Sequence, residues 1–180
     1  MAISGMNIEE WNLLLVFFKS FFFTFRGLWK ITNESFKKLI QKKYLSDKAI
    51  VREYHVKIAT QLEKTKNDIR KLEEQTNHLF AAQDYDELKH TISDIENFLI
   101  LFNPYTKYEL SRYWQALEVN GYDPVVEYSK RLETFEVHFS PNPEDLFTII
   151  LQISRFLKEF ADFENHTTPK YRHPYIKGKA

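Results

Sequence analysis

The sequence predicts a mainly α-helical protein, which begins with a small unit containing a β-hairpin and continues as a run of paired helices. Three observations support this prediction. Apolar residues recur at helical spacing along most of the 180 residues. A period of two is confined to one short stretch near the N-terminal end. Glycine (4 residues) and proline (6 residues) are scarce, which disfavours long linkers and many-turned β folds.

The first part of the chain is expected to form a helix, then a β-hairpin. Asn7 and Glu10 have the spacing of a capping box, in which each side chain satisfies a free backbone N–H group at a helix start. Phe21, Phe23 and Phe25 recur with a period of two. Residues 26–27 can turn the chain, and residues 28–32 can return as a second strand. The hairpin is the one β-element that the sequence predicts.

A second helix is predicted after Asn33, which is a good N-cap residue. Its apolar face holds Phe36, Leu39 and Ile40, and its other face carries four lysines, Lys37, Lys38, Lys42 and Lys43. A helix, a hairpin and a helix in this length are the outline of a compact α+β unit, such as the last part of a winged helix. We therefore expect a winged-helix-like unit over residues 1–45.

The pattern of apolar residues predicts helices almost throughout residues 46–165. We expect residues 166–180 to form an extended tail. Helix starts are marked by Ser46-Asp47, Asn67-Asp68, a capping box of Thr106 with Glu109, and Pro124. Helix ends are marked by Asn103-Pro104, Asn120-Gly121 and the loop Ser140-Pro141-Asn142-Pro143. Between residues 84 and 102 the apolar pattern continues as one segment. The last helix has a face wide enough to contact helices on two sides: Leu146, Ile149, Ile150, Ile153, Phe156, Leu157 and Phe160.

Two stretches share one order of residue types: LFAAQDYDEL at residues 79–88 and FLKEFADFEN at residues 156–165. The order predicts a corner between two packed helices, because alanine lets helices approach, aspartate caps the next helix and the aromatic residue fills the angle. At the first corner these residues are Ala81 and Ala82, then Asp84 or Asp86, and Tyr85. The recurrence predicts an α-solenoid, and it favours a corner over a metal or catalytic site.

No group of residues predicts a catalytic, cofactor-binding or metal site. The six histidines include no pair four residues apart and no H-E-x-x-H motif: His55, His78, His90, His138, His166 and His173. Glu9-Glu10 and Glu144-Asp145 are expected in first helical turns, where carboxylates offset the helix dipole. The chain has no cysteine, no clustered glycines for a phosphate loop and no G-x-S-x-G motif. We therefore expect no enzymatic activity, no cofactor and no metal.

Charge and hydropathy restrict the class of partner. The 25 basic residues balance 25 acidic ones, so the chain lacks the basic footprint of a dedicated nucleic-acid binder. The most apolar stretch, residues 11–25, follows two glutamates, is interrupted by Lys19 and is shorter than the ~20 apolar residues of a membrane span. We expect it to be buried core. In the tail, KYRHPYIKGK mixes bases with Tyr171 and Tyr175, which suits contact with an acidic surface on tubulin, nucleic acid or another protein.

Three parts of the chain carry a resemblance to a known family. They are ISGMNIEEWNLLLVFFKSFFF with LWKITNESFKKLIQKKYL, then RKLEEQTNHLFAAQDYDELKHTISDIENFLILF, and finally YELSRYWQAL with LFTIILQISRFLKEFADFEN. In order and spacing they resemble the junction between the winged helix and the tetratricopeptide repeats (TPRs) of the large nephrocystin-like signalling ATPases of the NACHT/STAND type. The resemblance covers roughly residues 3–165, about nine-tenths of the chain.

The resemblance implies a winged helix followed by a TPR-like helical region, without the ATPase core. The family's nucleotide-binding loop and magnesium-binding aspartate lie upstream of the matched residues. Asn33 stands where related ATPases place a nucleotide-sensing histidine. After Asn165 the second helix of the repeat is not recognisable. The chain therefore resembles a truncated relative, or a fragment that keeps the junction and lacks the nucleotide site.

The expected function is a non-catalytic scaffold or adaptor, which binds other proteins in a larger assembly in the cytoplasm. The resemblance implies a ciliary or microtubule-associated setting. Two alternatives stay open. One is a regulatory module that acts in trans on an NTPase subunit. The other is a winged-helix nucleic-acid binder, whose affinity would fall steeply with salt and which would use Arg26, Lys30, Lys37 and Lys38.

Overall fold

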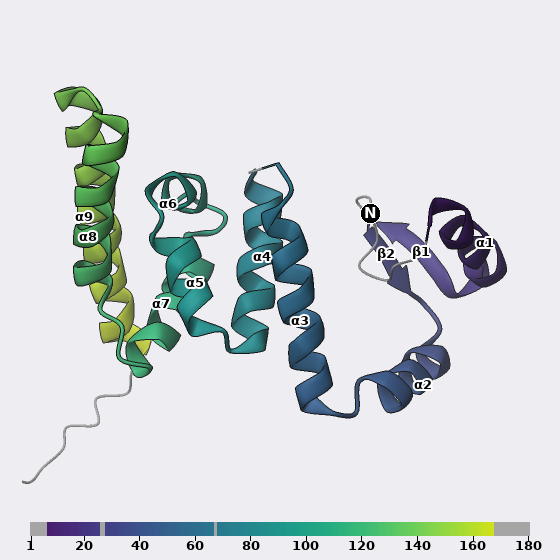
Figure 1. The fold of residues 1–180 in the computed structure, drawn as a ribbon. Helices are drawn as coiled ribbons and strands as arrows, with labels where there is room; N and C mark the ends of the chain where they lie inside the picture. Colours follow the sequence, from purple (N-terminus) through teal and green to yellow (C-terminus); the bar gives the residue numbers. More distant parts are fainter. Residues whose placement is uncertain (1–6, 26–27, 67, 168–180) are drawn as a thin grey trace, which may run out of the picture. The chain divides into compact units, whose positions relative to one another are not determined.

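The protein is mainly α-helical with one small β-hairpin, as predicted (Figure 1). The computed structural model describes residues 7–25, 28–66 and 68–167, and within these residues it contains nine α-helices. The elements are α1 (Ile8–Phe18), η1 (Lys19–Phe21, a short 3₁₀ helix), β1 (Phe22–Phe25), β2 (Leu28–Ile31), α2 (Glu34–Tyr44), α3 (Lys48–Glu63), α4 (Ile69–Ala82), α5 (Tyr85–Ser93), α6 (Ile95–Leu101), α7 (Lys107–Val119), α8 (Pro124–Phe139) and α9 (Pro143–Thr167).

The contacts between residues divide the chain into two units, Met1–Asp84 and Tyr85–Ala180. The first unit holds the hairpin and the helices α1 to α4, and the second holds α5 to α9. The predicted boundary between residues 45 and 46 lies inside the first unit, between α2 and α3, and stays a prediction. The predicted tail begins at residue 166, whereas α9 continues to Thr167; the residues after it lie outside the described part of the chain.

The predicted capping box starts α1. The Asn7 side chain accepts a hydrogen bond from the Glu10 backbone N–H group, and the Glu10 carboxylate accepts one from the Asn7 N–H group, both at 2.9 Å. The expectation that residues 11–25 form buried core is wrong for α1, because no residue of this helix is fully buried. The apolar side chains of α1 are too numerous and too evenly spread for the short hairpin beside it to cover them.

The hairpin pairs β1 with β2 antiparallel, with Phe22 opposite Ile31, and the predicted turn at residues 26–27 lies outside the described residues. Phe21 belongs to η1 and not to the first strand, although its carbonyl accepts a hydrogen bond from the Thr32 N–H group at 2.8 Å. Phe21 and Phe36 rings lie 4.9 Å apart between centroids, which packs α2 onto this segment.

Helices α3 and α4 form an antiparallel pair, and both start where predicted (Figure 1). The Asp47 carboxylate accepts from the Ala49 N–H group and the Asp68 carboxylate from the Lys71 N–H group, each at 2.8 Å. Asn67, the other residue of the second predicted cap, lies outside the described residues. Five side chains of α4 are buried, on one face of the helix: Leu72, Gln75, Thr76, Leu79 and Ala82.

The first predicted corner is present at the end of α4. Gln83 takes a left-handed conformation (φ 55°), and the Gln83 and Asp84 N–H groups bond back to Phe80 and Leu79 carbonyls. Of the two alanines of the predicted corner, Ala82 is fully buried, whereas Ala81 is exposed. The chain restarts as α5 directly after Asp84.

The continuous segment predicted from residue 84 to residue 102 is wrong, because it divides into α5 and α6 at Asp94. Asp94 has an extended backbone (φ −58°, ψ 132°), and its carboxylate accepts a hydrogen bond from the Asn97 N–H group at 3.0 Å. The Asn97 side chain donates to the Thr91 carbonyl at 3.0 Å, which satisfies an acceptor at the end of α5. Both helices keep apolar residues turned inward, so the apolar pattern alone does not reveal the break.

The predicted capping box of Thr106 with Glu109 is also wrong. The Thr106 hydroxyl donates to the Leu101 carbonyl at the end of α6 and accepts from the Asn103 side chain at 2.6 Å. Glu109 instead forms an ion pair with Arg112 at 2.8 Å. The hydroxyl therefore closes the preceding helix and does not cap α7.

The core of the second unit is aromatic. Trp114, Tyr128, Phe98 and Phe156 are fully buried and come from four helices, α7, α8, α6 and α9. The Trp114 indole N–H group donates to the Tyr128 hydroxyl, which donates to the Ile92 carbonyl, both at 3.1 Å. The indole N–H group and the buried hydroxyl thus each have a partner, and these two hydrogen bonds tie α5, α7 and α8 together.

Helix α9 packs against both α7 and α8, as its wide apolar face predicts. The second predicted corner, at residues 156–165, is wrong because α9 runs straight through it. In this stretch, Phe156 and Phe160 are buried on one face of α9. No residue described there has the left-handed backbone conformation that Gln83 takes at the end of α4. An aspartate inside a helix costs only about half a kcal/mol, which does not end it.

Candidate functional site

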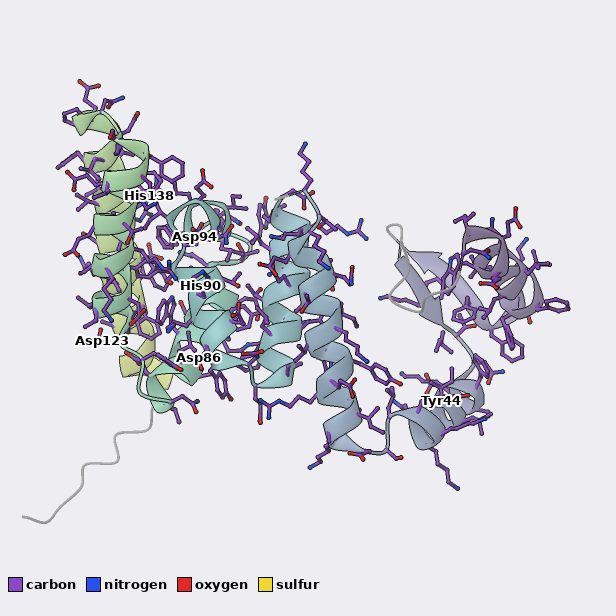
Figure 2. The ribbon with its side chains drawn as sticks, in the orientation of Figure 1. Tyr44, Asp86, His90, Asp94, Asp123 and His138 are labelled. Carbon is purple, nitrogen blue, oxygen red and sulfur yellow. The ribbon has the colours of Figure 1, made fainter. Side chains whose placement is uncertain are left out.

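Among the histidines whose side chains the structure describes, His55 and His78 form one pair, and His90 and His138 lie apart from them; nothing is described for the side chain of His166. Among residues 7–25, 28–66 and 68–167, no three His, Cys, Asp or Glu side chains come close enough to hold a metal ion. His90 on α5 bonds to Arg131, whereas His138 on α8 bonds to the Thr134 carbonyl of its own helix (Figure 2). His173 lies outside the described residues.

His55 on α3 and His78 on α4 form the pair, with 2.7 Å between their Nδ1 atoms. Burial lowers the pKa of the His78 imidazole, the neighbouring His55 lowers it further and Glu74 acts in the opposite direction. The nitrogens are too close to bind one tetrahedral zinc ion with bonds of about 2.0 Å. The pair is a hydrogen bond between helices. Sequence spacing did not reveal it, because the partners are 23 residues apart.

Asp86, one of the acidic residues of the first predicted corner, lies on α5 and makes structural contacts (Figure 2). Its carboxylate accepts a hydrogen bond from the Tyr122 hydroxyl at 2.8 Å and lies 3.8 Å from the Lys89 ammonium group. The bond to Asp86 is the main cause that raises the pKa of Tyr122. These contacts tie α5 to the loop between α7 and α8, and they support the structural interpretation of the corner.

A hollow between α7 and α9 is the candidate binding site, and we call it the α7–α9 hollow. Its volume is about 320 Å³, and it is lined by Phe102, Lys107, Tyr108, Ser111, Phe156, Glu159 and Asp162. Phe102, at the end of α6, and Phe156 provide two aromatic rings, which meet edge to face at 5.6 Å between centroids. The hollow therefore combines an apolar floor with a polar rim, as ligand-binding sites do.

Two cations hold the carboxylate of Glu159 on the rim of this hollow. The Lys107 Nζ atom lies 2.8 Å from one carboxylate oxygen, and the Arg155 Nε atom lies 3.1 Å from the other. The hydrogen bond from Lys107 is the main cause that lowers the pKa of Glu159. The Lys107 ammonium group also lies 5.4 Å from the centre of the Tyr108 ring. These charge interactions thus order the rim of the hollow.

Two other hollows are less suited to a partner. One, of about 410 Å³, lies between α3 and α4 at the end where these helices join, and includes Ile58, Leu62 and Glu74. The other, of about 200 Å³, lies between α6 and α8 around Arg131 and Phe135. The Arg131 guanidinium group already bonds to Ser93 and His90. The second hollow also holds two aromatic rings, Phe135 and Phe139, stacked at 4.8 Å between centroids, but it is smaller than the α7–α9 hollow.

The basic residues proposed for nucleic-acid binding are described only in part. Lys37 lies 3.6 Å from the Glu34 carboxylate of its own helix. Lys42 and Lys43 occupy the last turn of α2, where a cation offsets the helix dipole. Arg26 and the basic tail lie outside the described residues. In the part of the chain that the structure describes, no helix is both long and apolar enough to cross a membrane.

Comparison with known proteins gives one relative. The chain is 30% identical over 115 residues to a TPR repeat-containing protein of Dictyostelium discoideum. This match covers 62% of the chain but only 7% of the length of that protein. No family model matches the chain, and no solved structure matches it. The chain is therefore a mainly helical protein, TPR-like in its paired helices, with distant and partial similarity to a TPR repeat-containing protein.

Proposed function

We propose that the chain is a non-catalytic scaffold that binds other proteins, and that the α7–α9 hollow receives a side chain of the partner. The observation that carries this proposal is the hollow's construction, in which two phenylalanine rings form the floor and charged groups form the rim. The similarity to a TPR repeat-containing protein supports it, because stacked helical repeats create extended binding surfaces.

The residues of the hollow indicate which peptide it binds. Phe102 and Phe156 favour an apolar or aromatic side chain as the anchor. The charge of Lys107 is matched by Glu159, and Asp162 adds a further carboxylate to the rim. We infer that the preferred ligand carries a basic residue next to its apolar anchor.

Selection of peptides from a phage-displayed library on the immobilised chain tests the proposal. The double variant Tyr108→Ala/Asp162→Lys alters two exposed residues of the rim and leaves the core intact. Tyr105→Ala is the matched control, because Tyr105 is 90% exposed and does not line the hollow. We expect selected peptides to share an apolar anchor beside Lys or Arg, and to lose binding only to the double variant.

Two outcomes would place peptide binding outside the α7–α9 hollow. Peptides that bind the double variant as tightly as the original chain would place binding elsewhere on the surface. Equal losses in Tyr105→Ala and in the double variant would assign the effect to the exposed aromatic surface in general, and not to the hollow.

We further propose that the chain is built of a winged-helix-like unit (residues 1–45), a TPR-like region (46–165) and a tail (166–180), and that it works in a ciliary or microtubule-associated assembly. The helix–hairpin–helix order of the first 45 residues supports the first of these units. A fluorescently tagged chain in ciliated cells is expected to concentrate at the cilium or along microtubules. A uniform cytoplasmic signal contradicts this setting without affecting the hollow.

A further inference from the structure

Helix α9 is apolar on two opposite faces. One face is buried in the second unit by Ile149, Ile153, Phe156 and Phe160. At 3.6 residues per turn the other face holds Phe147, Ile150 and Leu151, which are 42% to 67% exposed, and then Lys158. We call Phe147, Ile150, Leu151 and Lys158 the α9 outer stripe. A helix that is apolar on both faces is typical of one that is covered on both.

Helix α1 also presents an uncovered apolar face. Leu13, Val16 and Phe17 are 60% to 79% exposed, and Glu9 precedes them on the same side of the helix. We call Glu9, Leu13, Val16 and Phe17 the α1 outer face. Contiguous exposed apolar residues of this kind mark interaction surfaces, whereas single exposed apolar residues do not.

The charges at the ends of these two surfaces are complementary in one orientation. The α1 outer face begins with acidic residues, Glu9 with its neighbour Glu10, and becomes apolar toward Phe17. The α9 outer stripe begins apolar at Phe147 and ends at Lys158. When the helices run antiparallel, the glutamates of α1 meet Lys158, and Lys19 beyond α1 meets the acidic first turn of α9. Parallel helices place like charges together instead.

The lengths of the two surfaces also match. With a rise of about 1.5 Å per residue, the α1 outer face spans about 12 Å and the α9 outer stripe about 16 Å. Antiparallel helices additionally bring opposite ends of their dipoles together.

We propose that the α1 outer face of one copy of the chain packs antiparallel on the α9 outer stripe of a second copy. The contact joins different surfaces of the two copies, so it is head-to-tail and each new copy offers another free face. One helix-on-helix contact lies at the low end of the roughly 1,200–2,000 Å² of specific interfaces, so the association is weak and depends on concentration.

Sedimentation velocity of the full chain at increasing concentration tests the proposal. We expect the mean mass to rise above the monomer, and to stay at the monomer in Val16→Glu and in Leu151→Glu. Val119→Glu is the matched control, since Val119 is an 88% exposed valine that belongs to neither surface. Association that survives either single variant, or that is lost in the control, overturns the proposal, as does an original chain that stays monomeric throughout.

A mixture of the two variants distinguishes head-to-tail contact from contact between identical surfaces. Val16→Glu keeps a working α9 outer stripe and Leu151→Glu keeps a working α1 outer face, so together they form one contact per pair. We expect dimers in the mixture and none larger. A mixture that stays monomeric contradicts the head-to-tail arrangement.

The orientation has its own test. Lys158→Glu replaces an attraction by a repulsion, so it should weaken the association by more than the roughly twofold to fivefold that loss of one exposed ion pair causes. Mixing it with the double variant Glu9→Lys/Glu10→Lys should restore the affinity if the helices run antiparallel. Absence of restoration at low salt contradicts that orientation. None of these variants alters the α7–α9 hollow, so peptide binding there is measured independently.

Discussion

At the residue scale, His78 shows how burial and a neighbouring imidazole together favour the neutral form of a histidine. With 2.7 Å between their Nδ1 atoms, one imidazole must donate a proton while the other accepts, so the pair bonds best when one ring at least is neutral. Burial lowers the pKa of His78, which means that the folded chain favours the neutral ring more than the unfolded chain does.

The pH dependence of stability follows from that direction. Because the unfolded chain binds the proton more tightly, the stabilising effect of neutral His78 is complete above the ordinary histidine pKa of about 6.5 and is lost as the pH falls through its lowered folded value. Urea unfolding between about pH 7.5 and 5 should show a smaller pH slope in His78→Gln, with a difference of at most about 1.4 kcal/mol per pH unit.

The double variant His55→Gln/His78→Gln provides the control for this prediction. If the two rings act through their mutual hydrogen bond, the free-energy changes of the single variants do not add. An unchanged pH slope in His78→Gln would falsify the assignment to this ring.

At the scale of the helix, two aspartates with similar sequence surroundings have different roles. Asp94 has an extended backbone and caps α6, whereas Asp162 lies inside α9. Ser93 and Thr91 next to Asp94 are buried in contacts with other helices, and these contacts hold the chain in a new direction. No such contact interrupts α9, whose buried residues continue at helical spacing on both sides of Phe156.

The stability of two alanine variants tests this difference. Asp94→Ala removes the acceptor for the Asn97 N–H group and should cost about 1 kcal/mol, as loss of an N-cap does. Asp162→Ala should change the free energy of unfolding by less than about 0.5 kcal/mol, since alanine suits a helix interior. Urea unfolding at neutral pH gives both values, and a cost at Asp162 equal to that at Asp94 means that residue 162 does not lie in a continuous helix.

At the scale of the whole molecule, the surfaces proposed above for association and for peptide binding are distributed over both units. The first unit offers the α1 outer face, and the second offers the α9 outer stripe and, separately, the α7–α9 hollow. A chain that joins its own copies through two surfaces and keeps a third for a partner presents many binding sites along one assembly. When the geometry lets several of these sites bind at the same time, the overall affinity exceeds that of each weak contact alone.

The sequence by itself determined the mainly helical class, the hairpin and most helix boundaries. These features follow from local chemistry: Asn7, Asp47 and Asp68 bond to backbone N–H groups two or three residues away, and Gly121 closes α7 with a positive φ. Only the tertiary structure decided the break at Asp94, the role of Thr106 and the continuity of α9. At Asp94, the neighbouring Ser93 is held by Arg131 from α8. The Thr106 hydroxyl bonds back to the end of the preceding helix, a choice that the spacing of a capping box does not exclude. In α9, an aspartate inside the helix costs too little to end it. The α7–α9 hollow and the His55–His78 pair also depend on the tertiary structure, because helices distant in sequence build them.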